Sequence, residues 1–244
     1  MQFLMLVCSE AEGSPFAVTE ADREGPGIRD ELCDEAITLD QLATWLLRDH
    51  AEAHALRALL LLQHARRPAR VAADGELIPL EEQDRSRWDR PMTAAGLEAL
   101  AQARAAADHR ERGLDGHVGP YRVQAEIAAL HSTAATPGEV DWVSIVAWYD
   151  TLLAATSSPV VALNRAVAVG MRDGPEAGLA ALDALAGERV LADHPQVPAV
   201  RADLLRRSGR REDALAAYRL ARAAARTDGV RLHLQHRIAE LDQG

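Results

Sequence analysis

The segment between Pro159 and Ala221 repeats itself, and this repeat limits the possible folds more than any other feature of the chain. Residues 164–185 align with residues 200–221 without a gap, at an offset of 36 residues (from 164 to 200). Each copy has a helical pattern, a glycine-containing break and a second helical pattern. The identical pairs are Arg165/Arg201, Ala166/Ala202, Glu176/Glu212, Leu179/Leu215, Ala180/Ala216 and Ala181/Ala217. Helix–turn–helix units of this period stack into solenoids, which more often bind partners than catalyse reactions.

The rest of the chain also favours helices. Leu, Ala and Arg, which are strong helix formers, dominate a chain that is 48% hydrophobic and only 4% aromatic. From Ile28 onward, apolar residues recur at helical spacing. We therefore predict an all-α fold, a tetratricopeptide-like helical-repeat solenoid.

One segment departs from this pattern. Asp74 and Gly75 lie between the β-prone residues Val71 and Leu77. Asp-Gly is favoured in tight hairpin turns, because both positions tolerate a positive φ. The sequence therefore predicts one short β-hairpin within the helical fold.

The chain divides into three predicted regions. Residues 1–27 lack a helical pattern and are predicted to be an atypical N-terminal arm or loop. Residues 28–118 are predicted to form a helical domain that carries the hairpin, and residues 119–244 to form the tetratricopeptide-like repeats. Within the last region, Thr136-Pro137-Gly138-Glu139 has the spacing of a capping box with proline at the first helical position, so a helix is predicted to start there.

Charge and composition exclude several functions. The net charge of −10 argues against a nucleic-acid-binding surface, which needs clustered positive charge. Cys8 and Cys33 give neither a disulfide framework nor zinc-ligand spacing. His50 and His54 share a helix face, but a third metal ligand is not evident from the sequence. No apolar run approaches the ~20 residues of a membrane span, so we predict a cytoplasmic protein without metal, cofactor, nucleic-acid or membrane partner.

Several long segments carry a resemblance to a known family. They are residues 64–67, 74–77, 83–89, 119–121, 127–131, 142–150 and 158–167. Through these segments the chain closely resembles the C-terminal extension of a group of bacterial extracytoplasmic-function RNA polymerase sigma factors, members of the sigma-70 family. The resemblance covers roughly Asp30 to Leu241.

The resemblance implies a function. In that family the extension carries tetratricopeptide-like repeats, follows two sigma domains that bind DNA and polymerase, and regulates the sigma factor. Here only about 27 residues precede the matching region, and they contain no helix-turn-helix. We therefore expect a non-catalytic protein-interaction or regulatory module that does not initiate transcription by itself. Its expected partners are sigma domains, core RNA polymerase or a DGPF/YCII-type protein, which Met1–Cys8 resembles more weakly.

Two groups of polar and aromatic residues are candidate functional positions. The predicted partner-binding residues lie on helices expected to line the solenoid: Tyr121, Gln124, His131, Tyr149, Asn164 and Arg165. A second group is predicted to anchor the hairpin to the helices: Asp84, Arg85, Arg87, Trp88 and Asp89. The alternative function is a small-ligand-binding protein or an enzyme that uses the Asp84/Asp89/His131 region for acid–base chemistry. Convergence of these three groups without arginine partners would favour the alternative.

Overall fold

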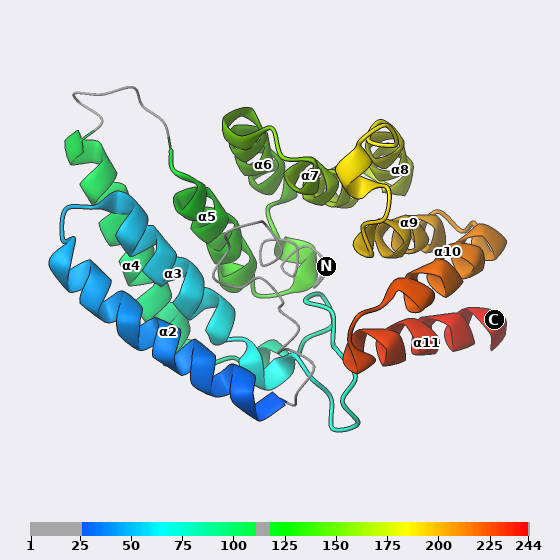
Figure 1. Ribbon diagram of the computed structural model, residues 1–244, viewed down its shortest axis with the longest axis horizontal. Helices are drawn as coiled ribbons and strands as arrows, with labels where there is room; N and C mark the ends of the chain where they lie inside the picture. Colours follow the sequence, from blue (N-terminus) through cyan, green and yellow to red (C-terminus); the bar gives the residue numbers. More distant parts are fainter. Residues whose placement is uncertain (1–25, 111–117, 244) are drawn as a thin grey trace. The chain divides into compact units, whose positions relative to one another are not determined.

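The computed structural model describes residues 26–110 and 118–243, and its regular elements there are all helices (Figure 1). The prediction of an all-α fold is confirmed. Single 3₁₀ turns at 67–69, 85–87, 137–139 and 189–191 connect the longer helices. The α-helices are α2 (Pro26–Leu46), α3 (Ala51–His64), α4 (Arg90–Arg110), α5 (Pro120–Thr133), α6 (Trp142–Thr156), α7 (Pro159–Asp173), α8 (Pro175–Asp183), α9 (Gln196–Arg207), α10 (Arg211–Ala224) and α11 (Asp228–Gln243).

The described residues belong to two compact units, each built from more than one stretch of chain. The first, here called the N-terminal unit, contains α2 to α5. The second, the C-terminal unit, contains α6 to α11 and the segment 70–83, which comes from between α3 and α4 in the sequence. These units divide the chain near residues 70, 84 and 142, whereas the boundaries at 28 and 119 stay predictions.

In the N-terminal unit, α3 is the central helix, and α2, α4 and α5 pack against it. Its apolar run, which includes Leu59 to Leu62, is buried because neighbouring helices cover more than one of its faces. Gly96 of α4 permits close approach, since a Cβ atom there would lie 2.8 Å from Cγ of Leu62. Glu52 of α3 caps α5: its carboxylate accepts the N–H groups of Tyr121 and Arg122 at 2.9 and 3.0 Å.

In the C-terminal unit, each helix from α6 to α11 packs mainly against its neighbours in the sequence. Helices α7 and α8 begin at Pro159 and Pro175, because proline fits the first helical turn. Gly170 and Gly178 meet where these two helices cross, and a Cβ atom on Gly178 would lie 2.8 Å from Cα of Gly170. The buried core of the unit runs from α7 to α11.

Burial follows the 36-residue offset of the sequence repeat. Ala166 and Ala202 are both fully buried, and Tyr218 is buried where Leu182 stands in the first copy. Ala180 and Ala216 are both exposed, so neither is the close helix contact that repeated alanines suggest. Their neighbours face inward, Ala181 partly and Ala217 almost completely. The repeat therefore preserves which side of each helix is covered.

The two repeat arginines make equivalent contacts. Nε of Arg165 on α7 donates to Asp150 of α6 at 2.5 Å, and Nη2 of Arg201 on α9 donates to Asp183 of α8 at 2.6 Å. In each case the first helix of one pair is joined to the second helix of the preceding pair. The repeat places the two arginines at equivalent positions, whereas their acidic partners, Asp150 and Asp183, do not follow the 36-residue offset.

The predicted β-hairpin is absent, since the described residues contain no strand pair at this position. Val71 and Leu77 form an isolated antiparallel bridge around the Asp74–Gly75 turn. Two backbone hydrogen bonds flank this bridge, from the Ala72 N–H to the Glu76 carbonyl at 2.9 Å and from the Ile78 N–H to the Arg70 carbonyl at 2.8 Å. The ladder stays at one bridge because the Glu76 N–H donates to Asp74 Oδ1 rather than back to Ala72, and the 3₁₀ turn at 67–69 ends the extended segment. The turn prediction was sound, and the same segment also bonds to α11, through the Leu77 N–H and the Gly229 carbonyl.

The predicted helix start at Pro137 is also wrong. Pro137–Glu139 forms only a 3₁₀ turn, and α6 begins at Trp142. The Thr136 hydroxyl donates to the Glu139 side chain at 3.0 Å and makes no capping bond to the backbone. The hydrogen bond within the side-chain pair therefore stabilises a turn before the helix.

Candidate functional site

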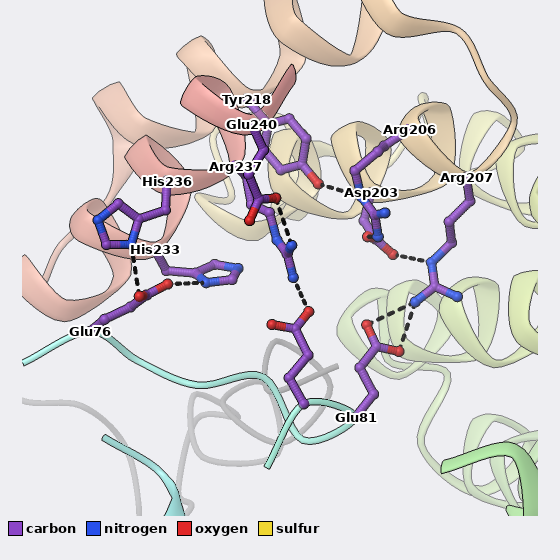
Figure 2. Close-up of polar contacts among 11 residues, drawn as sticks. Glu76, Glu81, Asp203, Arg206, Arg207, Tyr218, His233, His236, Arg237 and Glu240 are labelled. Carbon is purple, nitrogen blue, oxygen red and sulfur yellow. Dashed lines mark hydrogen bonds and ion pairs between the residues drawn. The ribbon is translucent and has the colours of Figure 1, made fainter. Parts of the chain in front are cut away.

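Residues 70–83 form a loop, here called the carboxylate loop, whose three glutamates contact α9 and α11. Figure 2 labels two of them, Glu76 and Glu81. Glu76, Glu81 and Glu82 each contact a different basic group. The backbone also fixes the loop, because Leu77 N–H donates to the Gly229 carbonyl at 3.3 Å. Gly229 permits this approach, since a Cβ atom there would lie 2.8 Å from the Gly75 carbonyl oxygen.

Glu81 contacts a network of hydrogen-bonded charges on α9. Nη2 of Arg207 donates to both Glu81 oxygens at 2.8 and 2.7 Å, while its Nε donates to Asp203 at 2.6 Å. Arg206 donates to the other Asp203 oxygen at 2.6 Å and to the Tyr218 hydroxyl at 3.3 Å (Figure 2). This arrangement joins the loop to α9 and α10 through hydrogen-bonded charges.

The charges in this network control its protonation. Burial alone would raise the pKa of Asp203, but Arg207 and Arg206 outweigh burial and lower it. Burial, reinforced by the charge of Asp203, raises the pKa of Tyr218 to about 12. Asp203 is therefore ionised and Tyr218 protonated at neutral pH, which suits them to holding the loop rather than exchanging protons.

Glu76 contacts imidazoles instead of guanidinium groups. Its Oε1 lies 3.0 Å from Nδ1 of His233, and its Oε2 lies 2.7 Å from Nδ1 of His236. The two histidines are one turn apart on α11 and point to the same carboxylate (Figure 2). Burial lowers the pKa of His233, although the hydrogen bond to Glu76 acts in the opposite direction. His233 is thus neutral at physiological pH.

Arg237 completes the contact between the loop and α11. Its guanidinium pairs with Glu82 of the loop and also donates to Glu240, one turn further along the helix, at 2.9 Å. The Arg237 side chain is largely buried by these contacts. The carboxylate loop is therefore held by its three glutamates, two on α11 and one on α9, and by the backbone bond to Gly229.

The N-terminal unit presents a different feature, a helix with its apolar side turned outward. On α2, Leu39, Leu42, Trp45 and Leu46 are 59%, 56%, 63% and 70% exposed and lie within one stripe of the helix. These four residues are called the apolar face of α2. The opposite side of the helix buries Asp40, to 5% exposure, and its carboxylate lies 3.7 Å from Arg57 of α3. Burial raises the pKa of Asp40 to about 6, against the opposing effects of Arg57 and His54.

The predicted anchoring cluster divides into two roles. Arg85 donates to the carbonyls of His131 and Ala134 at the end of α5, at 2.7 and 2.8 Å, and its guanidinium lies 4.6 Å from the ring centre of the buried Trp88. Asp84 and Asp89 are exposed caps, which accept the N–H groups of Ser86 and Met92 at 2.9 Å each. Arg87 is exposed.

These contacts also locate the groups proposed for acid–base chemistry. His131 is 1% exposed, whereas Asp84 and Asp89 lie at the surface. Burial, together with the charges of Arg66 and Arg85, lowers the pKa of His131 to about 3. His131 is thus neutral at physiological pH, and the two aspartates are occupied in capping.

The predicted partner-binding residues are distributed over both units. Tyr121, Gln124 and His131 belong to the N-terminal unit, and Tyr149, Asn164 and Arg165 to the C-terminal unit. His131, Tyr149 and Asn164 are buried, so their side chains pack inside their own unit. Gln124 donates to the Pro120 carbonyl at 3.2 Å, and Arg165 pairs with Asp150. A role for these six residues in binding a partner stays a prediction.

Sequence reasoning missed the contacts of the carboxylate loop. Glu76 and His233 are 157 positions apart, so no local pattern joins them. One signal was available: His233 and His236 have the i, i+3 spacing that places two imidazoles on one helix face. The outward apolar face of α2 was also missed, because Leu39 and Leu46 fit the helical pattern of a buried face.

No described helix is long and apolar enough to cross a membrane.

Comparisons with known proteins gave two matches, one to a family model and one to a protein sequence. The model of a family of unknown function, DUF6596, matches residues 17–104, which include the apolar face of α2. An uncharacterized protein of Rhizobium meliloti (strain 1021) is 44% identical over 221 residues. The match covers 88% of this chain and 50% of the relative, so the chain spans about half the length of the curated relative it matches. No solved structure matches. The chain is thus similar to DUF6596 in its first helices and to the Rhizobium protein over most of its length.

Proposed function

We propose that this chain is a non-catalytic protein-interaction module that regulates transcription initiation, like the sigma-factor extension it resembles. The observation that carries the proposal is the apolar face of α2. We further propose that the occupant of this face is a helical sigma domain of an extracytoplasmic-function sigma factor. The resemblance of the chain to the extension of such factors is the reason for choosing this partner.

The polarity of α2 supports a docking role. Asp40 and Thr44 are buried, while four large apolar side chains are exposed, the reverse of an ordinary surface helix. Burying one such side chain stabilises a structure by about 1.5–3 kcal/mol. A partner that covers the apolar face of α2 would gain this hydrophobic free energy for each side chain it buries. Contiguous apolar surface of this kind is typical of interaction sites.

The length of the relative and the packing of α6 to α11 give independent support. The Rhizobium protein contains about as much chain again as the part that matches, which fits a module that in some proteins is joined to further domains. Helices that pack on their sequence neighbours, with an ion pair at equivalent steps, fit a tetratricopeptide-like solenoid. Such arrays present extended surfaces for proteins.

The test is a binding titration between the full chain and the purified sigma domains of an extracytoplasmic-function sigma factor that carries this type of extension. Leu42→Asp and Trp45→Asp should each weaken binding at least tenfold, because each buries a charge in the interface. Leu220→Asp is the matched control, since Leu220 is 65% exposed on α10 of the other unit and should leave affinity unchanged.

Other outcomes would contradict the proposal in distinct ways. The same titration can use core RNA polymerase or a DGPF/YCII-type protein. If one of these binds the chain and the sigma domains do not, the apolar face of α2 belongs to that partner. Concentration-dependent dimerisation that Leu42→Asp abolishes would make the face a self-association surface. An equal loss of binding with Leu220→Asp would show that the apolar face of α2 is not the site.

A further inference from the structure

The tip of the carboxylate loop gathers three potential metal ligands from two elements. Asp74 and Glu76 come from the loop and His236 from α11, and one donor atom from each lies within 4.8 Å of the others. Gly75, between the two acids, has a φ of +90°, a conformation that glycine adopts readily. The turn also fixes its own geometry, because Asp74 Oδ1 accepts the Glu76 N–H at 3.0 Å.

The structure assigns to this cluster a binding site for a divalent first-row transition metal of the Zn²⁺ class, with Asp74, Glu76 and His236 as ligands. His233 is the supporting group, because it contacts the second oxygen of Glu76 at 3.0 Å and orients that carboxylate. One imidazole and two carboxylates form a nitrogen and oxygen donor set that suits zinc, and water would complete its coordination.

The partners of the loop glutamates distinguish this cluster from an ordinary ion pair. Glu81 and Glu82 face Arg207 and Arg237, which cannot bind a metal. Glu76 faces two imidazoles, and imidazole is a metal ligand. The two carboxylates also supply two negative charges, which a divalent ion balances.

The geometry needs only small side-chain movements. Two ligand atoms bound to zinc at about 2.1 Å and a tetrahedral angle lie roughly 3.4 Å apart. Glu76 Oε2 and His236 Nδ1 are now 2.7 Å apart, so the metal separates them slightly as it replaces the proton they share. That proton moves to Nε2 of the same ring. Asp74 is exposed and His236 is half exposed, which leaves both side chains free to adjust.

A metal here would fasten the loop to α11. The ligands come from residues 160 positions apart, so coordination would join distant parts of the C-terminal unit, next to the backbone contact at Gly229. Metal that binds the folded state alone raises the melting temperature with concentration. This gives the site a readout that needs no knowledge of the function of the protein.

The experiment titrates Zn²⁺ and, separately, Co²⁺ into the full chain and measures affinity and thermal unfolding. Wild-type protein should bind one ion at this site and melt at a higher temperature with metal. His236→Gln and Asp74→Asn should each weaken binding at least tenfold and reduce the shift in melting temperature. Both variants must melt like wild type without metal, which separates lost ligands from lost folding.

Two matched controls address the other donors of the chain. His50→Gln removes one imidazole of the His50/His54 pair on the other unit, and Asp242→Asn removes an exposed carboxylate of α11. Neither should change the affinity. The Co²⁺ complex should show weak d–d absorption without a thiolate charge-transfer band, because no cysteine is a ligand.

Four results would overturn the assignment, and the first three concern the ligands. They are unchanged affinity in His236→Gln, loss of binding in His50→Gln, and a cobalt–thiolate band that implicates cysteine. Equal affinity for Mg²⁺ or Ca²⁺ would do so as well, since it would show an acidic turn without imidazole coordination.

Discussion

At the scale of single residues, Trp88 is a buried aromatic ring with a cation on its face. The ring is 7% exposed and lies under the Arg85 guanidinium, which itself binds the carbonyl end of α5. The anchoring role of this cluster stays a prediction, and the element that Arg85 contacts is the end of α5.

Trp88→Ala should reduce the free energy of unfolding by about 3–5 kcal/mol, because it leaves a cavity and removes the surface on which Arg85 stacks. Chemical denaturation measures the change. Trp45→Ala is the control, since Trp45 is 63% exposed and its removal should cost less than about 0.5 kcal/mol. Equal effects of the two substitutions would contradict the anchoring role.

His131 should make stability depend on pH in the acid range. Burial and the nearby Arg66 and Arg85 lower its pKa from 6.5 to about 3, so between these values the unfolded chain binds a proton that the folded chain does not. Stability should therefore fall as pH decreases from 6.5, by at most about 1.4 kcal/mol per pH unit for this one group. Urea unfolding at pH 7, 5.5 and 4.5 should give a shallower decline in His131→Gln than in wild type. Parallel declines would show that His131 is not responsible.

At the scale of elements, the crossing of α7 and α8 depends on the absence of side chains. Gly178→Ala places a Cβ atom 2.8 Å from Cα of Gly170, which is backbone and cannot rotate away. We expect a loss of about 1–3 kcal/mol from overpacking, measured by thermal and urea unfolding. Gly187→Ala is the matched control, because an added Cβ atom meets nothing within 4 Å there. A neutral Gly178→Ala would mean that the helices separate without cost.

Elements were predictable where the signal is local. Pro159 and Pro175 mark helix starts through their fixed φ, and the repeat predicts which face of α9 is buried from that of α7. The hairpin prediction failed because the ladder around the Asp74–Gly75 turn stops at one bridge, where Asp74 Oδ1 takes the Glu76 N–H. The contact of this segment with Gly229, far along the sequence, has no local pattern that could predict it.

At the scale of the whole molecule, composition and helical periodicity predicted an all-α chain, since both reflect backbone preference. They did not predict that residues 70–83 join the C-terminal unit. The contacts of Glu76, Glu81 and Glu82 with α9 and α11 link residues more than 120 positions apart, and the sequence has no pattern over that range.

The carboxylate loop also sets an order of events during synthesis. The loop leaves the ribosome before α4, but its partners His233, His236 and Arg237 are on the last helix. Until α11 emerges, the acidic loop has only part of its binding surface, whereas α3, α4 and α5 can already pack together. Contacts over such separations form late because the chain must first close a long loop. The segment translated between α3 and α4 is therefore among the last parts of the protein to reach its final place.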